Sequence, residues 1–348
     1  MRAAVLSGGR MLVRDDVPEP VPGPGQLLAE VKACGICGSD LHFAKSGATL
    51  VQLISSMRGA PALGAGVDLA RDVFMGHEFC AEVLELGPDT EGPAPGTLVT
   101  SVPIMLGPTG IQDLAYSNDL PAGYSERMLL SASLVQRVPS GLGAGHAALT
   151  EPMAVGLHAV NRSGVAPGEG AVVIGCGPVG IAVIASLALR GVEPVVAADY
   201  SPMRRALAKR MGAHRVLDPS TEDVFEVWGS AGGAAPPVVF EAVGVPGVID
   251  AALRSAPPRA RLVVVGVCMG RDQITPFFGI AKELSVQFCL GYDLEEFAGT
   301  LRSIAEGALD VSPLITGEVG IDGVAGAFED LANPDDHCKI LVTSGSGG

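Results

Sequence analysis

The sequence predicts a two-domain α/β protein in which an all-β barrel domain is followed by a doubly wound parallel sheet. Three observations favour this fold class. Short strand patterns between turn residues fill positions 1–138, strands and helices alternate beyond Gly170, and 348 residues exceed the size at which a single core stops growing. We expect one domain over 1–151, joined by a returning tail over 291–348, and the other over 152–290.

The amino-terminal half is expected to hold six strands, because β-branched and aromatic runs there are bounded by glycine and proline. They cover 3–6, 11–14, 27–33, 79–86, 97–102 and 124–130. Within the stretch 45–72, apolar residues recur at helical spacing, namely Leu50, Leu53, Ile54 and Met57. We interpret this stretch as a surface helix over the barrel, with a wall of a substrate cleft as the alternative.

The second half alternates strands with helical patterns. Strands are predicted at 171–174, 194–198, 215–217, 238–242, 261–265 and 285–290, and the tail adds a helix at 294–306 and a strand at 339–343. Six strands joined by crossover helices form a doubly wound parallel sheet.

A glycine-rich turn follows the first of these six strands. Gly175, Gly177 and Gly180 have G-x-G-x-x-G spacing between a buried strand and an apolar helix, and they enclose Pro178 and Val179. The first glycine permits a tight turn, the second lets a pyrophosphate approach the backbone, and the third lets helix and strand pack closely. The sequence therefore predicts a dinucleotide site.

Asp199, at the end of the next strand, bears on the choice of dinucleotide. It lies 19 residues beyond Gly180, where a carboxylate accepts hydrogen bonds from a ribose 2′-OH and repels a 2′-phosphate. The sequence therefore favours NAD over NADP. Tyr200 and Arg204 are further candidate cofactor contacts, and Arg204 with Arg205 could weaken the preference for NAD.

Composition excludes several classes of partner. The net charge of −15 argues against nucleic acid and anionic membrane surfaces. Residues 171–189 are uncharged and long enough for a membrane span, but three glycines and a proline interrupt them. Residues 1–9 lack the apolar core of a secretory signal, so a cytoplasmic protein is expected. Its seven cysteines, an odd number, are then expected to be thiols or metal ligands.

The β half also carries a set of metal-ligand residues. Cys34 and Cys37 form a C-x-x-C pair after a predicted strand, His77 precedes another strand, and Glu151 lies between the halves. Cys37, His77 and Glu151 could supply the three protein ligands of a catalytic zinc. The alternatives, a redox pair or half of a four-cysteine zinc site, fit poorly because no second C-x-x-C exists and the pair opens no thioredoxin-like unit.

Read together, these motifs resemble the zinc-dependent medium-chain dehydrogenases of the alcohol dehydrogenase superfamily, in their polyol, threonine and butanediol branch. The motifs are CGICGSDLH at 34–42, GHE at 76–78, EP at 151–152, the glycine turn, EAVG at 241–244, and Lys339. The resemblance implies a GroES-like barrel domain, a Rossmann domain, and an enzyme that transfers a hydride between NAD and a secondary alcohol, a polyol, or the corresponding ketone or aldehyde.

The resemblance also implies roles for single residues in the metal site. Cys37 and His77 match the thiolate and imidazole ligands, and Glu151 stands where the polyol branch has a carboxylate. Glu78 matches a glutamate that approaches the metal when ligands exchange, so whether Glu151, Glu78 or water completes the zinc shell stays open. Asp40 matches the carboxylate that orients the ligand histidine. Ser39 and His42 match a proton relay.

Other implied roles concern the cofactor and the departures from the family. Val243, Val265 and Val267 are expected beside the nicotinamide. Gly38 stands where some branches have an arginine, which leaves Lys339 and the helix N-terminus to bind the pyrophosphate. No cysteine occurs in 101–123, where many relatives bind a structural zinc, so one zinc per chain is expected. Relatives form dimers or tetramers.

Two other functions are weighed against this one. A zinc-free quinone or enone reductase shares the fold but lacks the cysteine, histidine and glutamate set. A non-catalytic dinucleotide-binding protein would be favoured by loss of a metal ligand. The intact set in this sequence counts against both.

Overall fold

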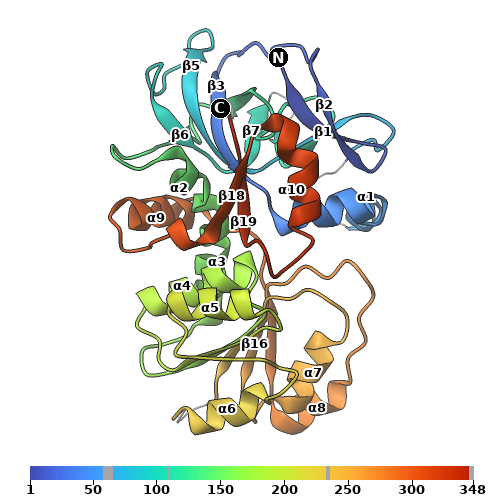
Figure 1. Cartoon of the computed structure of the whole chain (residues 1–348), viewed down its shortest axis with the longest axis vertical. Helices are drawn as coiled ribbons and strands as arrows, with labels where there is room; N and C mark the ends of the chain where they lie inside the picture. The colour runs from blue at the N-terminus through green and yellow to red at the C-terminus, as the bar shows by residue number, and fades with distance from the viewer. Residues whose placement is uncertain (58–65, 108–109, 233–235, 345–348) are drawn as a thin grey trace. The chain divides into compact units, whose positions relative to one another are not determined.

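The computed structural model describes the chain except for residues 58–65, 108–109, 233–235 and 345–348 (Figure 1). The chain forms two compact units. The first comprises Met1–Glu151, Leu301–Asn333 and Lys339–Gly348, and the second comprises Pro152–Thr300 and Pro334–Cys338. Residues 291–300, expected in the tail of the first domain, group with the second unit, in which Glu296 of helix α9 (Leu294–Ala305) bonds to His158 at 2.7 Å.

Among its described residues, the first unit contains two main sheets and a two-stranded sheet. One sheet has the order β2-β1-β4-β9, the other has the order β11-β6-β5-β3-β19-β18 with β10 also paired to β3, and β7 pairs with β8. The strands are β1 (Ala3–Ser7), β2 (Arg10–Arg14), β3 (Gln26–Gly35), β4 (Val73–Met75), β5 (Glu78–Leu86), β6 (Leu98–Thr100), β7 (Ile104–Gly107), β8 (Gly110–Asp113), β9 (Tyr116–Ser117), β10 (Arg127–Ser131), β11 (Gln136–Arg137), β18 (Ile315–Val319) and β19 (Lys339–Thr343).

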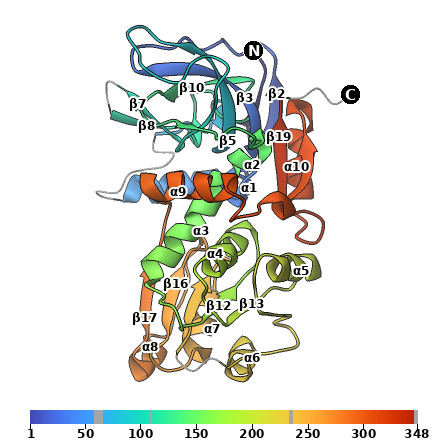
Figure 2. The ribbon, with the colours of Figure 1, turned by 90° about the vertical axis from the view of Figure 1, so that its left-hand side faces the viewer.

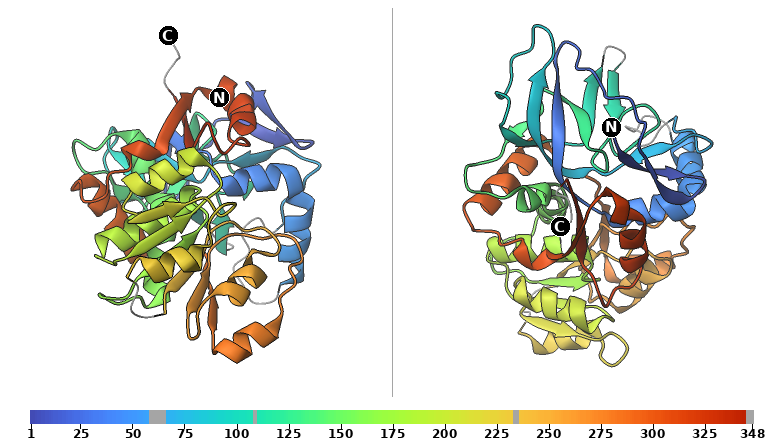
Figure 3. Two further views of the ribbon diagram at one scale, coloured as in Figure 1. Left: turned by 60° about the horizontal axis from the view of Figure 1, so that its bottom comes forward. Right: turned by 45° about the horizontal axis from the view of Figure 1, so that its top comes forward.

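Strand β3 is the centre of the larger sheet. Most of its residues are buried, and it pairs antiparallel with β5, β10 and β19. The red carboxyl-terminal strand β19 therefore lies against the blue strand β3, as the right-hand view of Figure 3 shows. In the register, Gly35 lies opposite both Glu78 and Leu341. This register brings together the end of β3 and the starts of β5 and β19, which are three segments far apart in the sequence.

The helices of the first unit include α1 (Gly38–Ser56), α2 (Ala144–Ala148) and α10 (Val324–Asp330), with 3₁₀ turns at Ser312–Leu314 and Ile321–Gly323. Helix α1 kinks at Ser46, which has non-helical backbone angles. The predicted apolar stripe is only partly buried: Leu50 packs against the core of this unit, whereas Leu53 and Met57 are 42% and 59% exposed. The rest of the predicted long stretch includes 58–65, which lie outside the described residues.

The second unit is a doubly wound parallel sheet, as predicted. Its six strands have the order β14-β13-β12-β15-β16-β17 and all pair in parallel. Strands β12, β13, β15 and β16 are largely buried, in keeping with helices on both faces. The strands are β12 (Ala171–Ile174), β13 (Val195–Ala198), β14 (Arg215–Leu217), β15 (Val238–Glu241), β16 (Arg261–Val264) and β17 (Ser285–Phe288).

Helices cover this sheet on two sides. In Figure 2, α4 and α5 lie on one side of β12 and β13, and α6 and α8 lie on the other. Helices α6, α7 and α8 share a hydrophobic cluster with the strands. The helices are α3 (Thr150–Ser163, which begins in the first unit), α4 (Pro178–Leu189), α5 (Pro202–Arg210), α6 (Val224–Ser230), α7 (Val248–Ser255) and α8 (Pro276–Lys282).

The uncharged stretch 171–189 forms β12, the glycine turn and α4. Within the described ranges, none of the helices combines the length and the apolar content that crossing a bilayer requires.

Candidate metal centre and dinucleotide turn

The loop between β3 and α1 carries Cys37 and Asp40. Cys37 has an extended backbone and is the N-cap residue of α1, so its side chain lies at the end where backbone N–H groups are unpaired. The Asp40 Oδ2 accepts the backbone N–H of Cys37 at 3.1 Å. This turn holds the Cys37 sulfur beside the positive end of the helix dipole, which favours a negatively charged ligand atom.

His77 lies in the turn between β4 and β5. Gly76 precedes it with a φ of +98°, and a Cβ there would lie 2.8 Å from the backbone nitrogen of Tyr124, so only glycine fits. His77 is buried, with Nε2 3.4 Å from the Ser39 Oγ and Nδ1 3.4 Å from Oδ1 of Asp40. With Nδ1 turned to the carboxylate, Nε2 is the ring nitrogen available to a metal.

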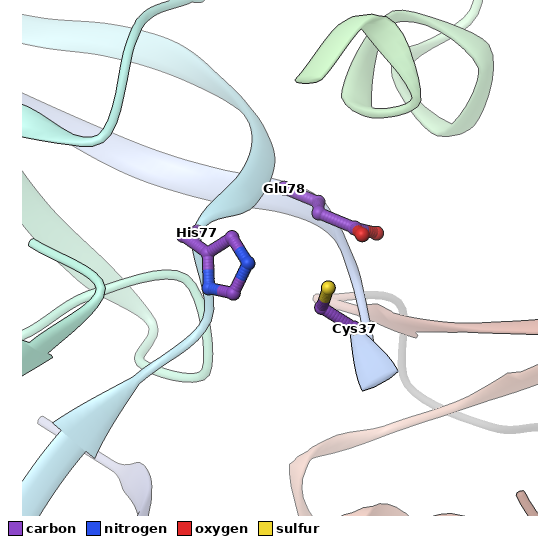
Figure 4. A group of neighbouring side chains, drawn as sticks. All are labelled: Cys37, His77 and Glu78. Atoms are coloured by element: carbon purple, nitrogen blue, oxygen red, sulfur yellow. The ribbon is translucent and has the colours of Figure 1, made fainter. Parts of the chain in front are cut away.

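Three side chains converge at this point. The ligand atoms of Cys37, His77 and Glu78 lie within 4.8 Å of one another, and Figure 4 shows the three groups pointing toward a common space. Across the described ranges of the chain, no other group of three or more histidine, cysteine or acidic residues meets this criterion. A thiol, an imidazole and a carboxylate are the donor set of a catalytic zinc site. The residues therefore fit the metal that the sequence suggests.

Glu151, predicted as the third ligand, is not part of this group. It lies in the first turn of α3 and is buried, with 8% of its surface exposed. Glu78 is in the group instead because it follows His77 directly and begins β5 opposite the end of β3.

Glu78 forms an ion pair with Lys339 at the start of β19. The Lys339 Nζ lies 2.7 Å from each Glu78 carboxylate oxygen and also donates to the carbonyl of Ile36 at 3.0 Å. Both side chains are fully buried. The Lys339 ammonium group faces the Glu78 carboxylate inside the first unit, and its contact with the cofactor pyrophosphate stays a prediction.

The buried Asp40 carboxylate is also held by Tyr124, a residue that the sequence analysis did not single out. The Tyr124 hydroxyl donates to Asp40 Oδ2 at 2.6 Å. Burial and the charge of Asp40 raise the pKa of Tyr124 well above its usual range, so this hydroxyl keeps its proton. Burial alone would lower the pKa of His77, but Asp40 raises it well above the usual range.

The remaining predicted residues of this site lie on α1. Ser39 is half-buried beside His77, and His42, one turn further along the helix, is exposed. Cys34, the other cysteine of the C-x-x-C pair, is buried in β3, and burial raises the pKa of its thiol well above the usual range. A neutral, buried thiol is a poor nucleophile, which argues against a redox pair.

The dinucleotide turn of the second unit is built from backbone. Gly175 has a φ of +94°, and a Cβ on Gly180 would lie 1.9 Å from the carbonyl oxygen of Gly175. Gly177 is the N-cap of α4, with Pro178 at its first position and Val179 following. A Cβ on Gly177 would meet nothing nearer than the Arg204 guanidinium at 3.8 Å. The turn thus leaves the N-terminus of α4 open, as a phosphate site requires.

Asp199 links this turn to the next helix. Its Oδ2 accepts the backbone N–H of Cys176 at 2.7 Å, and its Oδ1 accepts that of Ser201 at 2.8 Å. The carboxylate is therefore fixed at the end of β13, and Tyr200 beside it is 72% exposed.

Two arginines near Asp199 have different surroundings. The Arg205 guanidinium donates to the carbonyls of Asp199 and Tyr200, at 2.8 and 2.7 Å, and pairs with Asp218 at 3.0 Å. The Arg204 guanidinium lies by Gly177, and its Nε is buried without a hydrogen-bond partner among the described residues. Arg204 is therefore available to an anion, whereas Arg205 has a structural role.

The predicted nicotinamide contacts follow β15 and β16. Val243 and Val267 are 40% and 52% exposed, and Val265 is buried at 7%; the contact of these residues with the nicotinamide stays a prediction. The buried Glu241 carboxylate accepts the N–H groups of Val243 and Gly244 at 2.7 and 2.9 Å. Glu241 thus shapes the loop that presents Val243.

Comparisons with known proteins show the family to which the chain is similar. Residues 23–140 match the family model described as "Alcohol dehydrogenase GroES-like domain", and residues 178–306 match that described as "Zinc-binding dehydrogenase". The chain is 32% identical to the (R,R)-butanediol dehydrogenase of Bacillus subtilis, over 98% of this chain and 99% of that protein. It is 30% identical to the L-threonine 3-dehydrogenase of Pyrococcus horikoshii, over 92% and 91% of the two chains.

Solved structures show the same architecture. The crystal structure of the 2R,3R-butanediol dehydrogenase from Bacillus subtilis superposes with a TM-score of 0.82 at 30% identity, covering 99% of each chain. A protein from Sinorhizobium meliloti, bound to NADP, superposes with a TM-score of 0.80 at 27% identity, covering 98% of each chain.

Proposed function

The chain belongs to the zinc-dependent medium-chain dehydrogenases, and from this membership we propose that it transfers a hydride between NAD and a secondary alcohol or polyol, or the corresponding ketone or aldehyde. As a member of this family it is an oxidoreductase that acts on alcohols or polyols. The observation that carries the finer proposal is the convergence of Cys37, His77 and Glu78 within 4.8 Å.

We propose that this group holds one zinc ion. When bound, zinc supplies a Lewis acid that lowers the pKa of an alcohol hydroxyl. The chain's own residues orient the site: Asp40 faces Nδ1 of His77 and leaves Nε2 for the metal. Ser39, whose hydroxyl lies beside His77, accepts the substrate proton, and the exposed His42 on the same helix passes it to solvent.

The third ligand is a carboxylate, and we propose Glu78 for the arrangement seen here. The ion pair with Lys339 offsets the cost of burying this carboxylate and holds it beside His77 and Cys37. The family resemblance suggests Glu151 as the alternative ligand. The Glu151 side chain is also buried.

We propose NAD as the cofactor. The Asp199 carboxylate is fixed at the end of β13, where it would accept the ribose hydroxyls and repel a 2′-phosphate. The Arg204 guanidinium beside Gly177, whose buried Nε has no hydrogen-bond partner among the described residues, would contact the cofactor phosphates. The charge of Arg205 is paired with the Asp218 carboxylate at 3.0 Å.

We further propose that the chain forms homodimers or homotetramers in the cytoplasm. Strand β17 is an edge of its sheet, and Val286 and Phe288 on it are 42% and 69% exposed, as are Phe277 and Ile280 of α8 at 68% and 75%. Exposed apolar residues on a sheet edge favour association. Among the described residues, no disulfide joins any of the seven cysteines, as expected in a reducing compartment.

The experiment that tests this function is a panel of secondary alcohols, diols and polyols assayed with NAD and with NADP, before and after zinc removal. We expect NAD-dependent turnover that a chelator abolishes and that added zinc restores. Full activity on quinones or enones without zinc would instead assign the protein to the zinc-free reductases. Nucleotide binding with no turnover on any substrate of the panel would indicate a non-catalytic role.

Two isosteric variants distinguish the candidate third ligands. Glu78→Gln should weaken zinc binding by more than about tenfold, and Glu151→Gln should change it by less than about threefold. The reverse result would assign the ligand to Glu151. Zinc affinity is measured by competition with a chromogenic chelator.

A further inference from the structure

Tyr124 joins the two segments that carry the candidate metal ligands. Its backbone N–H donates to the carbonyl of Met75 at 3.1 Å, and the preceding Gly123 donates to the carbonyl of Gly76 at 2.8 Å. These bonds pair the chain before β10 with the residues that lead into His77. The Tyr124 hydroxyl reaches the other segment, because it donates to Asp40 in the first turn of α1 at 2.6 Å.

The hydroxyl bond fixes the orientation of the Asp40 carboxylate. Oδ2 accepts two hydrogen bonds, from the Cys37 backbone N–H and from Tyr124. With Oδ2 held on that side, Oδ1 lies on the side of His77, 3.4 Å from Nδ1, and neither of these two buried atoms has a hydrogen-bond partner among the described residues. Asp40 has no exposed surface, so the protein provides this orientation without help from bulk water.

We propose that Tyr124 is a positioning residue of the candidate metal centre: its hydroxyl holds Asp40 so that Nδ1 of His77 faces the carboxylate and Nε2 faces the metal. This inference rests on the proposed function, because it requires that Cys37 and His77 bind zinc. The Tyr124 hydroxyl contacts the Asp40 carboxylate at 2.6 Å and, more distantly, the Gly35 carbonyl at 3.5 Å, so its effect on the ligand side chains passes through Asp40.

The ring and the hydroxyl of Tyr124 have separable roles. The ring fills the space beside Gly76, where a Cβ would lie 2.8 Å from Tyr124 Cδ1, and it meets the Phe328 ring edge-on at a centroid distance of 6.1 Å. Phenylalanine would keep both contacts. A hydrogen bond of 2.6 Å to a carboxylate is short and charge-assisted, so the hydroxyl contributes to the order of Asp40 rather than only to packing.

The test compares Tyr124→Phe with Phe328→Leu. The first variant removes the hydroxyl and keeps the ring, and the second disturbs the ring contact and keeps the hydroxyl. We expect Tyr124→Phe to raise the zinc dissociation constant about tenfold, since loss of an outer-shell partner of a metal ligand costs about 10- to 100-fold. Phe328→Leu should change the zinc dissociation constant by less than about twofold while lowering thermal stability.

Two further measurements separate positioning from general destabilisation. The visible absorption bands of the cobalt-loaded protein report ligand geometry, and we expect Tyr124→Phe but not Phe328→Leu to shift them. In an Asp40→Ala background, adding Tyr124→Phe should have no further effect on zinc affinity, because the hydroxyl acts through Asp40.

The outcomes distinguish this inference from the proposed function. If the wild-type protein binds no zinc, the proposed function fails and the inference fails with it. If the wild-type protein binds zinc but Tyr124→Phe changes the dissociation constant and the cobalt bands no more than Phe328→Leu does, only the role of Tyr124 is overturned. An undiminished effect of Tyr124→Phe in the Asp40→Ala background would likewise contradict it.

Discussion

The candidate metal centre and the dinucleotide turn are built in different ways. The metal centre is assembled from side chains of four separate segments, with buried bonds between residues 84 and 261 positions apart. The dinucleotide turn is formed mainly by the backbone of one continuous segment, in which glycines leave space for a ligand. The first site should therefore depend on distant partners, and the second on the absence of a Cβ at a few positions.

The largest effect is expected from Lys339→Met, which tests the dependence of the metal centre on a distant partner. In the zinc-free protein, loss of the ammonium group leaves the Glu78 carboxylate buried without its counter-charge, and breaking a buried ion pair from one side lowers the free energy of unfolding by about 3–5 kcal/mol. Chemical denaturation should show this loss. The double variant Lys339→Met with Glu78→Gln should recover much of it. A decrease of less than about 1 kcal/mol in the free energy of unfolding of the single variant would show that Lys339 does not stabilise the buried Glu78 carboxylate.

Gly180→Ala and Gly177→Ala test the dinucleotide turn as a matched pair. A methyl group on Gly180 would overlap the Gly175 carbonyl, and such overpacking costs about 1–3 kcal/mol. The position of a Cβ on Gly177 is open, so Gly177→Ala should lower the free energy of unfolding by less than about 1 kcal/mol. The same variant should raise the KM for NAD. Neither should change zinc affinity. Equal losses of stability in the two variants would contradict a backbone-built turn.

The smallest effect concerns Asp199, the side chain on which the cofactor preference of the turn depends. Asp199→Ala should lower the ratio of kcat/KM for NAD to that for NADP by about tenfold, because a charge repulsion of about 1–4 kcal/mol is removed. Arg204→Ala serves as the opposite-charge control and should not lower the ratio. A wild-type protein that prefers NADP would overturn the assignment of NAD.

The same contrast explains what could be predicted from the sequence. The parallel sheet was predicted closely, with 171–174 and 215–217 matching β12 and β14, because buried β-branched runs and glycine spacing are local signals. Several short strands of the first unit were not predicted, namely β4, β7, β8, β9 and β11. Each has only two to four residues, which is too few to show the alternation of apolar and polar residues that marks a strand. Residues 124–130 were predicted as a strand that begins at Tyr124, whereas β10 begins at Arg127.

Within the metal centre, Cys37 and His77 were identified because each lies in a short motif. The pairing of Glu78 with Lys339 and the bond from Tyr124 to Asp40 were not, because they depend on the register of β3, β5 and β19, which no local pattern specifies. Lys339 was accordingly placed at the cofactor. A single tyrosine in an apolar strand pattern offers no signal that its hydroxyl meets a carboxylate.

The most direct test of the central claim is the zinc content of the purified protein and of its Cys37→Ser variant, measured by elemental analysis after dialysis against trace zinc. We predict about one zinc per chain in the wild-type protein and almost none in the variant, with alcohol turnover lost together with the metal. Equal zinc content in both proteins, or full turnover in the variant, would contradict a metal centre built on Cys37 and His77.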